Sequence, residues 1–244
     1  MKRLTGFTLV ELLLVIGVVA LLLSLLLPAL GKARAAARTA ADLANLRSIQ
    51  QANTLYIVDN RGALLSVVER LNAPPNQRAV SWTELLRAYD PAILLRSPVD
   101  DSPHFEPADG SPGQPIGGIY RTTSYSVNRY LAPNYPGGKR SAAEVRRPEA
   151  TVHVGVKVFL AADPADQRPV WDHFHADAWD PFPGLVDPAS VAAQEAQIDA
   201  HGGDPTSPDA MSVYGYLDGH AAAHRFADVY TDAGRNRFDP NVAK

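Results

Sequence analysis

The segment 171–180, WDHFHADAWD, gathers the side chains best suited to metal chemistry. His173 and His175 would face the same way on an extended strand, because side chains two residues apart share a face. Asp177 and the neighbouring aspartates supply oxygen ligands, so the group suits a Zn²⁺-like or a Ca²⁺-like site. The same alternation also fits an exposed loop with two aromatic anchors, and no third spaced histidine accompanies the pair. We keep His173, His175 and Asp177 as candidate ligands of a divalent metal and expect no other cofactor.

A second group, Asp218, His220 and His224, could be drawn as a catalytic triplet. However, Asp218-Gly219 separates VYGYL from HAAAHRF, which is the signal for a hairpin with a two-residue type I′ turn. We favour the hairpin, in which His220 only begins a strand. The chain has no G-x-S-x-G, H-E-x-x-H or P-loop motif, and its lack of cysteine excludes thiol catalysis and thiolate metal sites. We therefore predict that the protein is not an enzyme.

These groups belong to a chain of 244 residues, which has room for one ordinary globular domain and an appendage. The formal net charge of -3 shows no excess of positive charge, so we expect no nucleic-acid partner. The 20 prolines and 17 glycines predict a body rich in loops. The mean hydropathy of -0.13 conceals a division, because the first 31 residues are strongly apolar and the remainder is not.

Residues 12–31 carry no charge and, at about 1.5 Å per residue, form a helix of roughly 30 Å, the thickness of a bilayer core. A cleaved secretory signal is the alternative, since Lys2 and Arg3 precede the apolar run and small residues follow it. The run is longer than usual for such a signal, and Glu11 lies inside it. A carboxylate in a membrane segment usually marks a function or a partner.

The residues Gly6-Phe7-Thr8-Leu9-Val10-Glu11 closely resemble the class III signal of type IV prepilins and type II secretion pseudopilins. The resemblance implies that a prepilin peptidase at the cytoplasmic face cuts between Gly6 and Phe7 and methylates the new amino terminus. Glu11 matches the glutamate that the family keeps five residues into the mature chain. Pro28 falls where many members have a proline that kinks the helix, and a proline inside a helix removes one backbone hydrogen bond.

The resemblance also implies a division into a leader (1–6), a transmembrane part of the helix (7–31), an amphipathic soluble part (32–60) and an extracytoplasmic pilin-like domain (61–244). The protein would cross the bacterial inner membrane once, with its amino terminus in the cytoplasm. Expected partners are copies of itself, other pilins or pseudopilins, the prepilin peptidase, the inner-membrane assembly platform and the lipid bilayer.

Beyond the apolar segment the sequence remains rich in strong helix formers. Apolar residues recur there every three or four positions and predict one buried stripe: Leu43, Leu46, Ile49, Ala52 and Tyr56. Arg47, Gln50 and Gln51 lie off this stripe. The helix should end near Asn60-Arg61-Gly62, because asparagine and glycine favour a helix stop.

The remaining chain predicts an α+β fold in which the long helix packs on a small antiparallel sheet. Ser81 and Glu84 form a capping box that opens a short helix ending near Asp90-Pro91, and residues 97–118 have loop composition. Strands are expected at three places: 119–127, 151–160, and 213–217 continuing through a turn into 221–226.

The carboxy-terminal part is similar to pseudopilin-like proteins labelled by a histidine, nine residues and an Asp-Gly pair (H-X9-DG). The resemblance is carried by three elements: YGYLDGH at 214–220, SYSVN at 124–128 and RPEATV at 147–152. The spacing differs here, because position 208 is Pro208 and the nearest upstream histidine is His201. Position 97, where many relatives have cysteine, is Ser97.

The sequence thus predicts a subunit of a type IV pilus-like or type II secretion pseudopilus filament. The alternative is a membrane-anchored extracytoplasmic domain that binds metal or acts as an enzyme and uses a pilin-like anchor, with His173 and His175 at its site.

Overall fold

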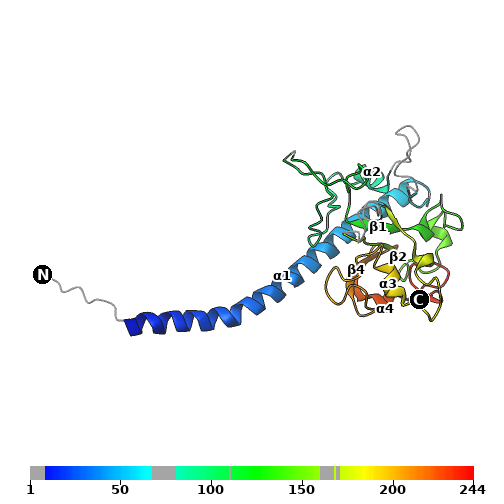
Figure 1. The fold of residues 1–244 in the computed structure, drawn as a ribbon. Helices are drawn as coiled ribbons and strands as arrows, with labels where there is room; N and C mark the ends of the chain where they lie inside the picture. Colours follow the sequence, from blue (N-terminus) through cyan, green and yellow to red (C-terminus); the bar gives the residue numbers. More distant parts are fainter. Residues whose placement is uncertain (1–8, 68–80, 110, 160–167, 169–170) are drawn as a thin grey trace. The chain divides into compact units, whose positions relative to one another are not determined.

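The computed structural model describes residues 9–67, 81–109, 111–159, 168 and 171–244, and it has an α+β fold (Figure 1). The chain divides into two units, 1–38 and 39–244, and each is described by itself. The predicted cleavage position at Gly6 and Phe7 lies outside the described residues. The helices and strands are α1 (Leu9–Asp59), α2 (Trp82–Arg87), β1 (Tyr125–Asn128), β2 (Val152–Val156), β3 (His173–Phe174), α3 (Pro188–Ala192), β4 (Met211–Tyr216), β5 (Ala221–Arg225), α4 (Phe226–Val229), β6 (Tyr230–Asp232) and β7 (Arg235–Asn236).

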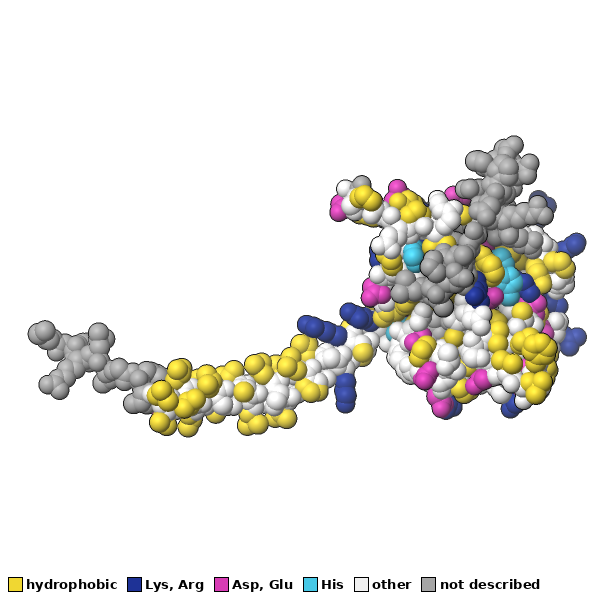
Figure 2. Space-filling view, viewed as in Figure 1, with side chains coloured by type: hydrophobic (Ala, Val, Ile, Leu, Met, Phe, Trp, Pro, Cys, Tyr) yellow, Lys and Arg dark blue, Asp and Glu magenta, His cyan; other side chains and the backbone are white. Residues whose placement is uncertain are grey.

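The first unit is helical from Leu9 onward, as predicted, and α1 continues without interruption through Pro28. The bend expected at Pro28 stays a prediction. The large apolar side chains of this segment are 40% (Leu30) to 74% (Leu9) exposed. Figure 2 shows them covering the visible face of the segment, with lysine and arginine side chains after them. α1 is long and apolar enough to cross a membrane, although a signal sequence or a core helix can have the same length and composition.

In the second unit, α1 contributes a buried stripe that confirms the predicted one. Leu46, Ile49 and Ala52 are at most 1% exposed, and Leu43 and Tyr56 are partly buried against the same core. The stop was also predicted correctly: Arg61 and Gly62 take positive φ values of 55° and 87°. The Gly62 amide then donates to the Ile57 carbonyl at 2.7 Å, which satisfies one of the orphan carbonyls of the last helical turn.

One prediction about this face of α1 is wrong. Gln50, expected to lie off the stripe, is fully buried, as are Asp42 and Asn53. Gln50 fits because Gly215 on β4 has no side chain; a Cβ atom there would lie 2.8 Å from Gln50 Nε2. These polar residues lie buried beside the apolar stripe because the sheet and two loops offer them polar partners, described below.

The predicted capping box at the start of α2 is confirmed. The Ser81 side chain accepts a hydrogen bond from the Thr83 amide (3.4 Å), and Glu84 Oε2 accepts one from the Ser81 amide (3.3 Å). α2 ends at Arg87, slightly before the predicted stop. Its first residue, Trp82, is fully buried and its Nε1 donates to the Asp172 carbonyl at 3.1 Å, which joins α2 to the start of β3.

The central sheet has five strands in the order β3-β1-β2-β4-β5. The β1–β2, β2–β4 and β4–β5 pairs are antiparallel, whereas β3 pairs with β1 in parallel through Val127↔His173 and Asn128↔Phe174. The prediction of a purely antiparallel sheet is therefore wrong, and the sheet is mixed. Strands β1, β2, β4 and β5 lie within or next to the predicted segments, although Leu160, the end of one predicted segment, lies outside the described residues.

The β4–β5 hairpin was predicted correctly, but its turn type was not. Gly219 has a φ of 106°. Among the described residues other than glycine, only Arg61 has a positive φ, so Asp218 lacks the positive φ that a type I′ turn requires at both central residues. The Gly219 amide donates to the Tyr216 carbonyl (3.0 Å) and the Tyr216 amide to the His220 carbonyl (2.8 Å). This is a three-residue loop with glycine at the left-handed position.

Apolar residues cover both faces of the sheet. One core contains the stripe of α1 together with Tyr125, Val127 and Val154 of the central strands. The other core contains Trp179 and is ringed by aromatic side chains; its ring partners are Phe174, Phe226, Tyr230 and Phe238. Because both faces are covered, β1 and β2 are buried along their whole length.

Candidate functional site

The Asp42 carboxylate, on α1, is the centre of a buried polar cluster in the second unit. Its Oδ2 accepts hydrogen bonds from Ser97 Oγ at 2.7 Å and from His201 Nε2 at 2.9 Å, and its Oδ1 accepts one from the Tyr125 hydroxyl. His201 Nδ1 lies 3.0 Å from Thr39 Oγ1, one helical turn before Asp42. We call Asp42, Ser97, Tyr125 and His201 the Asp42 cluster.

The Asp42 cluster is closed to solvent. Asp42 is 0% and Ser97 is 2% exposed, and the His201 side chain is 4% exposed. Burial, together with the negative charge of Asp42, raises the pKa of Tyr125, so its hydroxyl stays protonated and donates. A buried carboxylate requires such donors, since an unpaired charge in a low-dielectric interior is strongly unfavourable.

The cluster brings together residues that sequence reasoning had noted for other reasons. In the resemblance to H-X9-DG proteins described above, Ser97 stands at a position expected to be cysteine, Tyr125 is the tyrosine of the SYSVN element, and His201 is the nearest histidine before Asp218-Gly219. The resemblance gave none of them a contact with α1. Asp42 itself was missed, because a single aspartate in an alanine-rich helix reads as a solvated residue.

A hydrolase triad places histidine between the hydroxyl and the carboxylate, so that the ring can take the hydroxyl proton. Here the carboxylate lies between them, since Ser97 and His201 both donate to Asp42 Oδ2. This geometry is suited to holding the turn of α1 that carries Asp42 against the sheet and the surrounding loops. The arrangement therefore favours a positioning role for the cluster.

A second buried polar chain continues from Ser97 under the loop 97–118. The Ser97 amide donates to Ser124 Oγ (2.9 Å), which donates to Asp100 Oδ2 (2.6 Å). Asp100 pairs with Arg121 at 2.9 Å, both side chains being fully buried. Burial lowers the pKa of Arg121 to about 10, against the attraction of Asp100. These contacts fix Ser97 and Asp100 to the residues just before β1.

The structure confirms that His173 and His175 lie close together, and it changes the identity of their acidic neighbours. The two ring centres are 4.7 Å apart. His173 Nδ1 lies 2.8 Å from Asp172 Oδ1, and His175 Nδ1 lies 3.0 Å from Glu195 Oε1. Glu195 was missed in the sequence because it is 20 residues further along the chain, just after α3.

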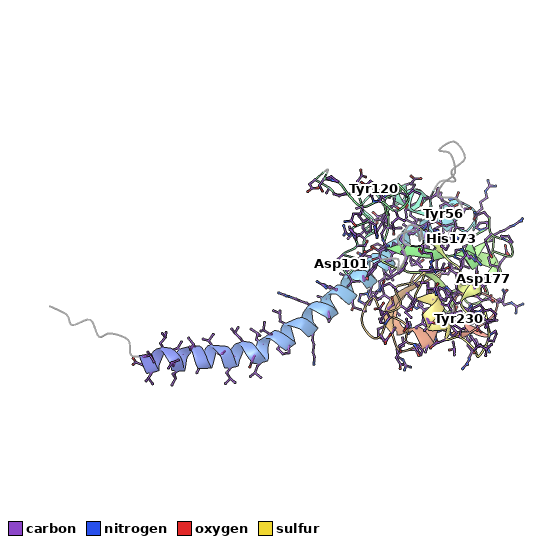
Figure 3. All side chains as sticks on the ribbon, in the orientation of Figure 1. Tyr56, Asp101, Tyr120, His173, Asp177 and Tyr230 are labelled. Carbon is purple, nitrogen blue, oxygen red and sulfur yellow. The ribbon has the colours of Figure 1, made fainter. Side chains whose placement is uncertain are left out.

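Asp177, labelled with His173 in Figure 3, is not part of this pair. Its carboxylate accepts hydrogen bonds from Arg129, at 2.7 Å from Nε and also from Nη2. An aspartate whose two oxygens accept from two N–H groups on one edge of a guanidinium is in a strong bidentate ion pair rather than an open metal ligand. The structure thus pairs Asp177, the third of the candidate ligands, with Arg129, and the candidate ligand set of His173, His175 and Asp177 stays a prediction. Within the described residues, no three or more His, Cys, Asp or Glu side chains are placed to hold a metal ion.

The remaining candidate residues have local partners. His220 Nδ1 lies 2.6 Å from Asp218 Oδ1, and the His220 ring stacks on Tyr216 at 4.2 Å. These contacts hold the hairpin loop.

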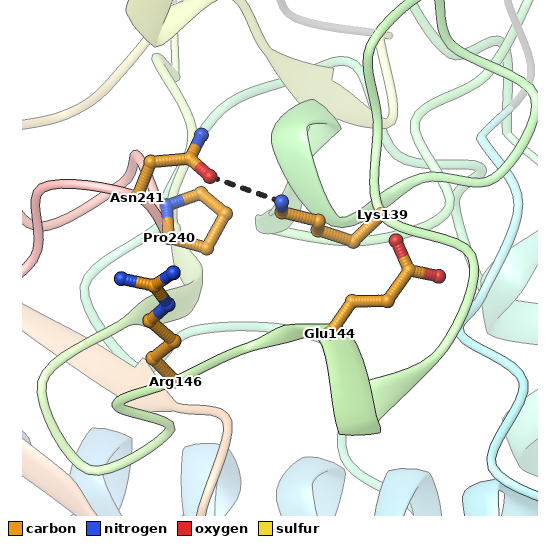
Figure 4. Close-up of a pocket in the computed structure, with 5 residues that line it drawn as sticks. All are labelled: Lys139, Glu144, Arg146, Pro240 and Asn241. Carbon is orange, nitrogen blue, oxygen red and sulfur yellow. Dashed lines mark hydrogen bonds between the residues drawn. The ribbon is translucent and has the colours of Figure 1, made fainter.

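A surface pocket of about 430 Å³ lies between the 3₁₀ turn η3 (Ala142–Glu144) and the carboxy-terminal segment, lined by Lys139, Glu144, Arg146, Pro240 and Asn241 (Figure 4). Lys139 Nζ donates to Asn241 Oδ1 at 3.0 Å, and Glu144 accepts the Arg140 and Ser141 amides. Lys139, Glu144 and Asn241 thus already have hydrogen-bond partners, and we assign the pocket no ligand.

Glu11 lies exposed in the first turn of α1, where the positive end of the helix dipole favours a carboxylate.

Comparisons with protein-family models, with curated proteins and with solved structures found no match to this chain.

Proposed function

We propose that the protein is a subunit of a type IV pilus-like or type II secretion pseudopilus filament, processed between Gly6 and Phe7 and assembled through its N-terminal helix. The observation that carries the proposal is the motif GFTLVEL, whose residues from Leu9 onward open α1, a helix that is apolar and exposed in one unit and part of the core in the other. A helix of this kind suits a protein that is first held in a membrane and then packs with copies of itself.

Physical chemistry supports this role for the first unit. Monomeric soluble proteins rarely expose large continuous apolar surfaces, and burying one leucine or valine side chain is worth about 1.5–3 kcal/mol. The surface formed by the exposed side chains from Leu9 to Leu30 therefore favours lipid, or the same surface of neighbouring subunits, over water. In the proposed topology the amino terminus is cytoplasmic and the second unit is extracytoplasmic, across the bacterial inner membrane.

Glu11 has a specific part in the proposal. Cleavage after Gly6 creates a charged amine at Phe7, and this amine enters an apolar environment when helices pack in a filament. A carboxylate from a neighbouring subunit can pair with it and offset the desolvation of both charges, whereas a misplaced neighbour leaves both unpaired. Glu11 would thus set the register between subunits more than it adds stability.

Two measurements test the proposal. Amino-terminal sequencing of the membrane-extracted protein should begin at methylated Phe7; an intact Met1, or a start after the apolar segment, would contradict the prepilin assignment. Glu11→Ala and Glu11→Gln should leave cleavage largely intact and impair incorporation into filaments. Val10→Ala, a neighbouring change without a charge, is the matched control. Normal incorporation of both Glu11 variants would refute the pairing role.

A further inference from the structure

The hydrogen bonds of His173 and His175 determine which ring nitrogen of each is available. Their Nδ1 atoms lie 2.8 Å from Asp172 and 3.0 Å from Glu195, and a carboxylate can only accept. Each Nδ1 must therefore carry the proton, and in the neutral ring each Nε2 carries a lone pair. Two adjacent histidines thus present the tautomer in which metals are bound through Nε2.

Both Nε2 atoms are without a hydrogen-bond partner among the residues that the structure describes. The His173 side chain is 7% exposed, and its Nε2 is not among the fully buried, unpartnered polar atoms of the described residues, so water or an ion can reach the lone pair. An ion about 2.1 Å from a ring nitrogen lies roughly 3.2 Å from the ring centre, so two rings sharing it have centres at most roughly 6.4 Å apart. The observed separation of 4.7 Å is within this limit.

The supporting carboxylates are themselves fixed. Glu195 Oε2 accepts the His175 amide at 2.8 Å and the Trp179 indole at 3.3 Å. Such carboxylate–histidine pairs orient imidazole ligands and increase their basicity in metal sites.

From this geometry we infer that His173 and His175 bind one divalent transition-metal ion of the Zn²⁺ class through their Nε2 atoms, with water in the remaining positions. Nitrogen ligands suit Zn²⁺, Cu²⁺ and Ni²⁺, whereas Ca²⁺ takes oxygen ligands, so the site should discriminate against Ca²⁺. The inference goes beyond the proposed filament function and does not depend on it.

Calorimetric titration of Zn²⁺ into the full chain, purified in detergent without a histidine tag and stripped with a chelator, tests the site. We expect one Zn²⁺ per chain, no competition by equimolar Ca²⁺, and at least about tenfold weaker binding in His173→Ala and in His175→Ala. His220→Ala is the matched control, because His220 also pairs with an aspartate through Nδ1 but lies in an exposed turn, and it should bind as the wild type does.

Near-UV circular dichroism verifies that each variant is folded. If His173→Ala does not fold, His175→Ala decides, since His175 is the more exposed of the two (20%). Absence of Zn²⁺ binding to the wild type, binding within twofold of wild type in the folded histidine variants, or equal binding of Ca²⁺ would each overturn the inference.

Discussion

His153, on β2, is a histidine that the fold holds neutral. The residue is 2% exposed, and its Nδ1 lies 3.0 Å from Gln50 Oε1 and 3.4 Å from Asn53 Nδ2, both on α1. Burial lowers the pKa of His153 to about 4, because the charged ring would lose its hydration without gaining a carboxylate. The unfolded chain, in contrast, binds a proton to this ring near pH 6.5.

This difference predicts acid sensitivity with a defined window. Between pH 6.5 and about 4 the unfolded state binds a proton that the folded state does not, so lowering the pH favours unfolding. The contribution of His153 is complete above pH 6.5, and its loss should reach about 3 kcal/mol near pH 4. Urea unfolding of the full chain in detergent at several pH values measures the effect. His153→Gln should flatten the profile in this window, whereas His220→Gln, an exposed control, should not; equal slopes in wild type and His153→Gln would contradict the assignment.

The burial of the polar residues of α1 could not be predicted from the sequence, whereas the burial of its apolar residues could. Periodicity identified Leu46, Ile49 and Ala52 because apolar residues recur with the helical repeat. It placed Gln50 on the wrong side, since the burial of a polar residue depends on a partner elsewhere in the chain. For Gln50 that partner is 103 residues away, and for Asp42 it is 159 residues away at His201.

At the scale of elements, the Asp42 cluster fixes α1 against the rest of its unit. Its members come from α1, from the start of the 97–118 loop, from β1 and from the loop before β4, so one carboxylate joins four segments. Apolar packing alone tolerates small shifts of a helix along a sheet, because the hydrophobic effect is not directional. Hydrogen bonds to one buried carboxylate have directions, and they select a single position.

We therefore predict that Asp42→Ala destabilises the second unit by about 3 kcal/mol, because it leaves buried donors of Ser97, Tyr125 and His201 without their acceptor. Asp42→Asn, which keeps an acceptor oxygen, should cost less. Arg47→Ala, an exposed change on the same helix, should stay within about 0.5 kcal/mol of wild type. The free energy of unfolding in urea gives all three values, and an Asp42→Ala variant within 1 kcal/mol of wild type would contradict the role of the cluster.

The elements that sequence reasoning found are those with local signals. The capping box at Ser81, the stop at Gly62 and the Asp218-Gly219 hairpin all depend on residues a few positions apart. The two-residue strand β3 was missed because it is shorter than any periodic pattern, and its parallel pairing with β1 depends on a contact made 46 residues along the chain. The pair His173 and His175 was found because its spacing is local, whereas Glu195 and the true partner of Asp177 were not.

At the scale of the whole molecule, α1 belongs to both units, and the boundary at residue 38 divides its two roles. Before the boundary its apolar side chains are exposed. After it, Asp42, Leu46 and Ile49 belong to the interior of a unit that contains both apolar cores. Helices shorter than about 12–15 residues are marginal in water alone, so this second part of α1 depends on that packing.

Two shortened chains test this division. Residues 39–244 keep the Asp42 cluster and the buried stripe, so we expect a monomer that is soluble without detergent and unfolds cooperatively in urea. Residues 53–244 lack Asp42, Leu46 and Ile49, whose loss removes roughly 5 kcal/mol or more, comparable with the 5–15 kcal/mol that stabilises a typical domain. This shorter chain should lose its near-UV circular dichroism and aggregate. If 39–244 needed detergent, or if 53–244 unfolded with the same midpoint as 39–244, the second part of α1 would not be an integral part of the core.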